Sequence, residues 1–241
     1  MTTANEQAGA FLVFGYARAV TSQAALAGRF GVVIPAAGSG SRFGGDKLSQ
    51  NIAGKSVIEH AVDAFRHRED VGLVVVVGKL IELNRVSWCP GGETRSESVK
   101  LGLDHLRQLR PDCDFVAVHD AARPAVSQSL VDRVFDAAVR HGAAVPGLVP
   151  TDTIKRVESD RIVETLSRQS LLAVQTPQAM RVDWLVDAYA KPTSQDDVTD
   201  DVSLLELAGY GIICVEGDAS NVKLTHGDDL QRLEQVLGRR T

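Results

Sequence analysis

The chain has 241 residues, of which 44% are hydrophobic and 24% are charged, and its formal net charge is −5. This balance is typical of a globular protein with a sizeable core, and the net negative charge argues against a nucleic-acid-binding protein. The cysteines, Cys89, Cys113 and Cys214, lie far apart in the sequence, so we expect neither a disulfide framework nor a zinc site.

The first 29 residues are expected to form an N-terminal extension, and residues 30–241 a single domain. The extension contains an apolar run from Phe11 to Phe14, which ends at Gly15 and has no basic start before it. This run is too short for a signal peptide or a membrane span. We therefore expect a cytoplasmic protein that binds neither a membrane nor nucleic acid.

Apolar runs alternate with segments of helical periodicity along much of the chain. Strands are expected at 29–35, 73–77, 86–88, 114–118 and 143–149, and helices at 57–68, 94–109 and 129–141. This alternation predicts an α/β fold of Rossmann-like type, in which helices flank a mainly parallel sheet. Ligands of such sheets bind beyond the carboxyl ends of the strands, so the residues that follow each strand are the candidates for a site.

The segment 151–168 interrupts the alternation, because it is polar and contains two short alternating stretches around Ser159 and Asp160. It is predicted to form a β-hairpin arm that projects from the sheet. Since a lone hairpin is marginally stable, we expect the arm to pack against a second subunit. Beyond the arm, strands are expected at 171–174 and 211–215, and helices at 182–189, 202–208 and 228–237.

A glycine-rich segment follows the first predicted strand and reads Pro-Ala-Ala-Gly-Ser-Gly-Ser-Arg-Phe-Gly-Gly-Asp-Lys at 35–47. Its small residues let backbone N–H groups approach a phosphate, and Arg42 and Lys47 add two positive charges. The segment lacks a glycine of the dinucleotide fingerprint at Phe43, and it lacks the Gly-Lys-Ser/Thr ending of a Walker loop. A triphosphate site is the functional prediction, and a solvated glycine-rich turn is the ordinary alternative.

The sequence His-Asp-Ala-Ala-Arg-Pro at 119–124 follows the fourth predicted strand. One carboxylate together with nucleotide phosphates is the usual way in which proteins hold Mg²⁺, and Asp120 is placed to supply it. Arg123 could bind an anionic acceptor. An Asp–Arg pair that shapes the turn is an equally good explanation, and His119 is assigned no catalytic role.

Two further segments complete the candidate site. In Asn-Val-Lys-Leu-Thr at 221–225, Lys223 could stabilise charge at a reacting phosphate. In Gly-Gly-Glu-Thr-Arg-Ser-Glu-Ser at 91–98, the backbone around Gly92 and Glu93 and the hydroxyl of Ser98 could recognise cytosine. A solvent-facing lysine and a plain helix cap by Thr94 are the ordinary alternatives.

Together these segments resemble the 2-C-methyl-D-erythritol 4-phosphate cytidylyltransferases of the non-mevalonate isoprenoid pathway, from about residue 31 to about residue 237. Further matches to this family are Asp-Thr-Ile-Lys at 152–155, Arg168, Gln-Thr-Pro-Gln at 175–178 and Thr-Asp-Asp at 199–201. The resemblance implies a nucleotidyltransferase that transfers a cytidylyl group from CTP to 2-C-methyl-D-erythritol 4-phosphate. The products would be 4-diphosphocytidyl-2-C-methyl-D-erythritol and pyrophosphate, formed by direct in-line attack without a covalent intermediate.

The resemblance also implies a role for each candidate residue. Arg42, Lys47, Lys223 and Asp120 are implied to be catalytic, with Asp120 also placing Mg²⁺; Ala36, Ala37, Gly38, Gly92, Glu93 and Ser98 are implied to bind cytidine; and Arg123, Thr153 and Arg168 are implied to bind the acceptor phosphate. In the family the hairpin crosses to the partner subunit, so a homodimer is implied.

The sequence departs from the family at Asp46, where proline is common and where an acidic side chain is expected to weaken phosphate binding slightly. The stretch between Val77 and Gly91 is also short. The nearest alternative is a D-ribitol 5-phosphate cytidylyltransferase, although the pairs Ala-Ala at 36–37 and 121–122 are more typical of the methylerythritol enzymes. A catalytically silent nucleotide-binding relative is a second alternative, and the retained charged residues argue against it.

Overall fold

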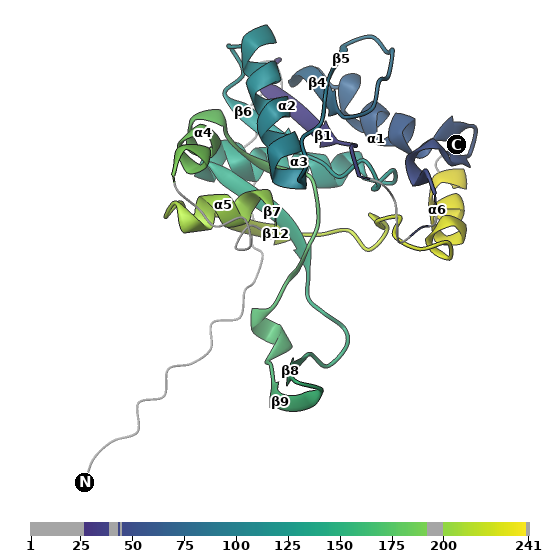
Figure 1. Ribbon diagram of the computed structural model, residues 1–241, viewed down its shortest axis with the longest axis vertical. Helices are drawn as coiled ribbons and strands as arrows, with labels where there is room; N and C mark the ends of the chain where they lie inside the picture. Colours follow the sequence, from purple (N-terminus) through teal and green to yellow (C-terminus); the bar gives the residue numbers. More distant parts are fainter. Residues whose placement is uncertain (1–26, 39–42, 44, 192–199, 240–241) are drawn as a thin grey trace.

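The computed structural model describes residues 27–38, 43, 45–191 and 200–239 (Figure 1). Its centre is an eight-stranded sheet of order β10-β7-β11-β6-β1-β4-β5, with β12 also paired to β7. The strands are β1 (Phe30–Pro35), β4 (Val71–Val77), β5 (Val86–Cys89), β6 (Phe115–Val118), β7 (Ala143–Leu148), β10 (Ala173–Val174), β11 (Gln178–Arg181) and β12 (Ile213–Glu216). The predicted α/β fold with a mainly parallel sheet is confirmed.

Parallel pairing dominates the sheet and aligns the carboxyl ends of its strands. Strand β1 is parallel to β4 and β6, β4 to β5, and β7 to β12. Strand β11 is antiparallel to its neighbours β6 and β7 and was not predicted, because Gln178 and Arg181 interrupt its apolar pattern. Gln178 pairs with Val118, the last residue of β6, so the segment before β11 reaches the carboxyl edge.

Helices cover both faces of the sheet (Figure 1). In the described part of the chain, α1 (Val57–Arg66), α3 (Gln128–His141) and α6 (Asp229–Gly238) pack on one face, and α2 (Arg95–Leu109), α4 (Val182–Ala190) and α5 (Asp201–Leu207) pack on the other. The alternation of strand side chains explains the two cores: Val32 and Ile34 of β1 belong to the first, and Val33 belongs to the second.

Helix α2 lies very close to β1. A Cβ atom built on Gly31 would lie 2.2 Å from Leu106 Cδ2, and one built on Gly102 would lie 2.6 Å from Val33 Cγ1. Only glycine leaves room for this approach. Because α2 begins directly after the β5 connection, its first turn lies at the carboxyl edge of the sheet.

An antiparallel hairpin extends away from the sheet (Figure 1). It consists of β8 (Lys155–Glu158) and β9 (Arg161–Thr165), and every residue of both strands is exposed. The turn residues Ser159 and Asp160 have φ values of 45° and 66°, as a two-residue type I′ turn requires. The hairpin belongs to residues 149–172, here called the arm, whose flanking residues Leu148 and Ala173 pair in β7 and β10.

Smaller elements account for the remaining differences from the predicted pattern. The strand expected at 171–174 is shortened to β10, because the 3-10 helix η3 (Arg168–Ser170) and its C-cap Leu171 precede it. A two-stranded hairpin of β2 (Asn51–Ile52) and β3 (Lys55–Ser56) precedes α1 and was not predicted. None of the helices within the described residues is long and apolar enough to cross a membrane.

Candidate active site

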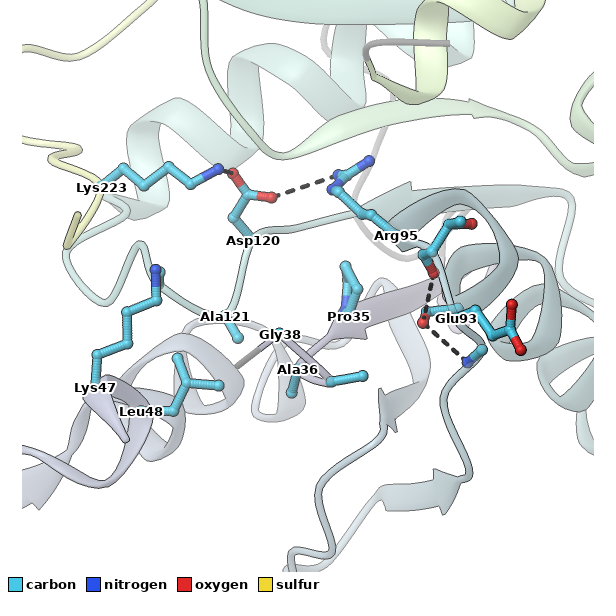
Figure 2. Close-up of a pocket in the computed structure, with 15 residues that line it drawn as sticks. Pro35, Ala36, Gly38, Lys47, Leu48, Glu93, Arg95, Asp120, Ala121 and Lys223 are labelled. Carbon is cyan, nitrogen blue, oxygen red and sulfur yellow. Dashed lines mark hydrogen bonds and ion pairs between the residues drawn. The ribbon is translucent and has the colours of Figure 1, made fainter. Parts of the chain in front are cut away.

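A cavity of about 270 Å³ lies at the carboxyl edge of β1, where several separate segments meet (Figure 2). It is lined by Pro35, Ala36, Ala37, Gly38, Lys47, Leu48, Gly92, Glu93, Thr94, Arg95, Ser98, Asp120, Ala121, Ala122 and Lys223. Nine of these residues were site candidates in the sequence: Ala36, Ala37, Gly38, Lys47, Gly92, Glu93, Ser98, Asp120 and Lys223. The structure therefore brings four distant sequence segments to one place.

The remaining four candidates are not among the residues that line the cavity in the described part of the chain. Arg42 lies outside the described residues, so the structure says nothing of its position. Arg123 does not line the cavity but lies directly behind it, with its Nε 3.6 Å from Asp120 Oδ2. Thr153 and Arg168 are exposed residues of the arm and do not line the cavity of their own chain, and Arg168 donates a hydrogen bond to the carbonyl oxygen of Thr151.

Asp120 is the electrostatic centre of the cavity. Its Oδ2 lies 2.8 Å from Lys223 Nζ, and its Oδ1 lies 3.4 Å from Arg95 Nη2 (Figure 2). Burial alone would raise the pKa of the Asp120 carboxyl, but the charges of Lys223, Arg95 and Arg123 outweigh burial and hold the pKa well below its usual range. Asp120 is therefore a carboxylate at neutral pH, which is the form that Mg²⁺ binds.

The described residues contain no cluster of three or more His, Cys, Asp and Glu side chains that could hold a metal ion. Two acidic residues line the cavity, the exposed Glu93 and Asp120, and only Asp120 lies among the cations Lys223 and Arg95. One carboxylate in such a setting suits a cation that arrives with the phosphates of a nucleotide. The donor set at Asp120 therefore fits Mg²⁺ bound together with CTP, and it does not fit a metal ion held by protein ligands alone.

Lys47 reaches the cavity from a short 3-10 helix, η2 (Lys47–Ser49), and its Nζ donates to Leu224 O at 3.1 Å. Asp46 caps this helix by accepting from Leu48 N at 3.2 Å. A hydrogen bond from Lys79, whose Nζ lies 2.7 Å from the carboxylate, lowers the pKa of Asp46 to about 2. The charge of Asp46 is thus offset locally, and the side chain also orients the backbone that presents Lys47.

The first turn of α2 forms the opposite wall of the cavity. Thr94 and Glu97 form a capping box, so the helix cap foreseen for Thr94 is present. The Ser98 hydroxyl accepts from Gly92 N at 3.1 Å and donates to Thr94 O at 3.0 Å, and only 2% of this residue is exposed. Glu93 N donates to Glu97 Oε2 at 2.8 Å, which fixes the backbone beside Gly92.

The loop that carries Ala37 is held tightly by two glycines from neighbouring strand ends. A Cβ atom built on Gly78 would lie 2.4 Å from Ala37 Cβ, and one built on Gly91 would lie 2.6 Å from the same atom. Ala36 N donates to Val77 O at 2.8 Å. This packing fixes the backbone between Ala36 and Gly38 along one side of the cavity (Figure 2).

His119 supports the turn that carries Asp120 and is fully buried. Asp120 N donates to Thr176 Oγ1 at 3.1 Å, and this hydroxyl lies 3.2 Å from His119 Nδ1. The other ring nitrogen lies 3.1 Å from Arg123 O. Burial lowers the pKa of His119 to about 4, so the ring is neutral at pH 7 and its hydrogen bonds hold the turn in place.

Sequence reasoning missed Arg95 and Asp201. Arg95 lines the cavity and its Nη2 lies 2.8 Å from Oδ2 of Asp201, which begins α5. Both residues occur in the quoted motifs at 91–98 and 199–201, but the sequence assigns neither a role. A pairing between residues 106 positions apart leaves no local signal in one sequence.

Comparison with known proteins agrees with this geometry. Residues 30–239 match the family model described as IspD: 2-C-methyl-D-erythritol 4-phosphate cytidylyltransferase. The "Bifunctional enzyme IspD/IspF" of Nitrobacter winogradskyi is 40% identical over 224 residues, which cover 87% of this chain and 56% of that protein. The chain thus spans little more than half the length of the curated relatives that it matches.

Solved structures of single enzymes match over nearly their whole length. The 2-C-methyl-D-erythritol 4-phosphate cytidylyltransferase of Thermus thermophilus has a TM-score of 0.71 at 33% identity, with 87% of this chain and 98% of that chain covered. The 2-C-methyl-D-erythritol 4-phosphate cytidylyltransferase of Francisella tularensis has a TM-score of 0.76 at 29% identity, and the match covers 86% of this chain and 99% of that chain. The chain therefore belongs to the 2-C-methyl-D-erythritol 4-phosphate cytidylyltransferase (IspD) family.

Proposed function

We propose that the chain transfers a cytidylyl group from CTP to 2-C-methyl-D-erythritol 4-phosphate and releases pyrophosphate, in isoprenoid precursor biosynthesis. The observation that carries this proposal is the meeting of Lys47, Lys223 and Asp120 in one cavity, beside the tightly packed backbone of residues 36–38. Two cations and a carboxylate suit a metal-bound triphosphate, and backbone groups with a buried hydroxyl suit a nucleobase.

In this proposal, the cations lower the energy of the transition state. Lys47 and Lys223 stabilise the negative charge that develops around the α-phosphorus, and Arg42 serves the same purpose. Ala36, Ala37, Gly38, Gly92, Glu93 and Ser98 hold the cytidine. Asp120 would hold Mg²⁺ together with the phosphates of CTP, and the bound ion would offset negative charge on the triphosphate.

The chemical step needs little from the protein beyond positioning. An oxygen of the acceptor phosphate attacks the α-phosphorus in line, a new P–O bond forms, and the bond to the oxygen that bridges to the β-phosphorus breaks. The electron pair of that bond leaves with pyrophosphate. A phosphate monoester is already anionic at pH 7, so no general base is required, and the catalytic contribution is orientation and charge stabilisation.

We further propose that the acceptor phosphate is bound by Arg123 together with Thr153 and Arg168 from the arm of a partner subunit, in a homodimer. The arm supports this, because it exposes large apolar side chains: Val157 is 56% exposed, Ile162 66% and Val163 50%. An exposed apolar cluster on a projecting hairpin is typical of a protein interface. The buried thiols of Cys89 and Cys113 suit the cytoplasm, where we propose that the enzyme works.

The decisive assay is pyrophosphate release from CTP and Mg²⁺, with 2-C-methyl-D-erythritol 4-phosphate and D-ribitol 5-phosphate compared as acceptors. The proposal requires turnover with the first acceptor and little with the second. Turnover with D-ribitol 5-phosphate alone would keep the mechanism and replace the acceptor. Tight CTP binding without turnover on either acceptor would favour the non-catalytic relative.

A further inference from the structure

The Arg95 guanidinium lies between two carboxylates and is held much more closely by one of them. The same nitrogen, Nη2, lies 2.8 Å from Asp201 Oδ2 and 3.4 Å from Asp120 Oδ1. Hydrogen bonds between charged groups have their best length near 2.7–2.9 Å, about the length of the first contact and well below the second. Arg95 is thus bound mainly to Asp201 and only loosely engaged with Asp120. Figure 2 shows the long contact between Arg95 and Asp120.

Asp201 is fixed in place and buried, with 1% of the residue exposed. The side chain of Gln178 in β11 anchors the start of α5. Its Oε1 accepts from Asp201 N and Val202 N, both at 3.2 Å, and its Nε2 donates to Asp200 Oδ2 at 2.8 Å. Burial raises the pKa of the Asp201 carboxyl, and the charge of Arg95 opposes that rise. Because a buried carboxylate is very unfavourable without a partner, Asp201 must keep Arg95 close to it.

This arrangement decides how much of Asp120 is available in the cavity. Lys223 Nζ already occupies Oδ2 of Asp120 at 2.8 Å, and Arg123 Nε lies 3.6 Å from the same oxygen. Oδ1 has only the long contact to Arg95 among the described residues. If Arg95 closed to an ordinary ion-pair distance of about 2.8 Å, both oxygens of Asp120 would be engaged by protein cations. The guanidinium would then crowd Oδ1 and bring a further positive charge to the place where a divalent cation would bind.

We propose that Asp201 is a positioning residue that, through Arg95, keeps Asp120 Oδ1 open for the divalent cation that accompanies the nucleotide. The inference rests on the proposed function of Asp120 as the carboxylate that binds this cation. Arg95 then contributes positive charge to the cavity without competing for the oxygen. In this proposal Asp201 acts only through the guanidinium of Arg95 and contacts neither the nucleotide nor the acceptor.

The test measures cation binding without turnover. Mn²⁺ is titrated into the enzyme with saturating CTP and no acceptor, and free Mn²⁺ is followed by electron paramagnetic resonance. Asp201→Asn removes the charge that holds Arg95 and keeps the shape of the side chain. We expect Mn²⁺ to bind about 10-fold more weakly, the loss that follows when a group orienting a metal ligand is removed. Unchanged Mn²⁺ binding would overturn the proposal.

A second variant separates positioning from simple structural support. In the double variant Arg95→Gln/Asp201→Asn there is no guanidinium to close on Asp120, and no buried charge is left unpaired. The proposal predicts that Mn²⁺ binding returns toward the wild-type value, a coupling that a double-mutant cycle measures directly. If the double variant binds Mn²⁺ as weakly as Asp201→Asn or more weakly, the role of Asp201 is structural and the proposal is wrong.

The chain offers a matched control in another Arg–Asp pair. Asp70 is 7% exposed and accepts two hydrogen bonds from Arg68, at 2.9 and 2.7 Å, outside the cavity. Asp70→Asn should leave Mn²⁺ binding unchanged, and a loss equal to that of Asp201→Asn would refute a specific effect. Because no step uses the acceptor, the result stands apart from the pyrophosphate assay, which tests the proposed reaction in the wild-type enzyme.

Discussion

The close packing of Gly78 against Ala37 yields a quantitative prediction. Gly78 has a φ of +88°, and an added Cβ would lie 2.4 Å from Ala37 Cβ and 2.7 Å from Ala37 Cα. Gly54 has nearly the same φ, +86°, but an added Cβ there has no described atom within 4 Å. Both alanine variants incur the left-handed backbone cost of about 1–2 kcal/mol, and only Gly78→Ala adds a clash.

The clash sets the expected difference between the two variants. Overpacking typically costs about 1–3 kcal/mol, so Gly78→Ala should lower the free energy of unfolding by that much more than Gly54→Ala. Urea denaturation with equal m-values measures the difference. Relief requires the Ala37 contact to open from 2.4 Å to the 3.4 Å of an ordinary contact. That is a displacement of about 1 Å in the proposed cytidine-binding backbone, which can reduce kcat/KM about 10²-fold.

The result that would refute this reasoning is specific. If the two variants have the same urea midpoint and the same kcat/KM for CTP, the backbone between Ala36 and Gly38 is not held by contact with Gly78. The cavity wall would then be adaptable, and the tight strand-end packing would have no part in binding the nucleotide.

Three further predictions follow from the cavity and the arm. Lys47→Ala and Lys223→Ala should each lower kcat by about 10²–10³-fold, with an unchanged far-UV circular dichroism spectrum; near-normal kcat in either variant would remove it from the mechanism. The pKa of His119 is near 6.5 in the unfolded chain and about 4 in the folded protein, so the unfolded state binds the proton first as the pH falls. Between pH 6.5 and pH 4, this group should therefore lower the free energy of unfolding of the wild type by about 3 kcal/mol. The free energy of unfolding of His119→Gln should fall less over the same range, and urea titrations at each pH measure both values. Ile162→Asp should shift the protein from dimer to monomer in sedimentation velocity, and a wild-type profile would contradict the arm-mediated dimer.

The sequence predicted the parts of the fold that depend on local patterns. Buried strands such as β1 and β4 are continuous apolar runs, and helices such as α3 carry regular apolar periodicity, so both kinds of element were recognisable. Strand β11 was missed because its four residues include Gln178 and Arg181, and its burial comes from its neighbours. The order of strands in the sheet is a non-local property that propensity does not encode.

The same distinction applies to the cavity. Asp120, Lys47 and residues 36–38 follow predicted strands, and parallel strands bring their carboxyl ends to one edge, so their proximity could be foreseen. The pairing of Arg95 with Asp201 could not be foreseen, because Asp201 is brought to Arg95 by the hydrogen bonds that anchor the start of α5 to Gln178. The role of Asp46 as a helix cap paired with Lys79 also depends on a contact between separate loops.

The pairing of Leu148 with Ala173 at the base of the arm makes the arm a separable module. The chain leaves the sheet and re-enters it at neighbouring positions, so residues 149–172 could be replaced by a tight turn without breaking the ladder. Such a truncated protein would keep every residue that lines the cavity while losing Thr153 and Arg168. Under the proposed function, recognition of CTP and binding of the acceptor would then be separable in one polypeptide.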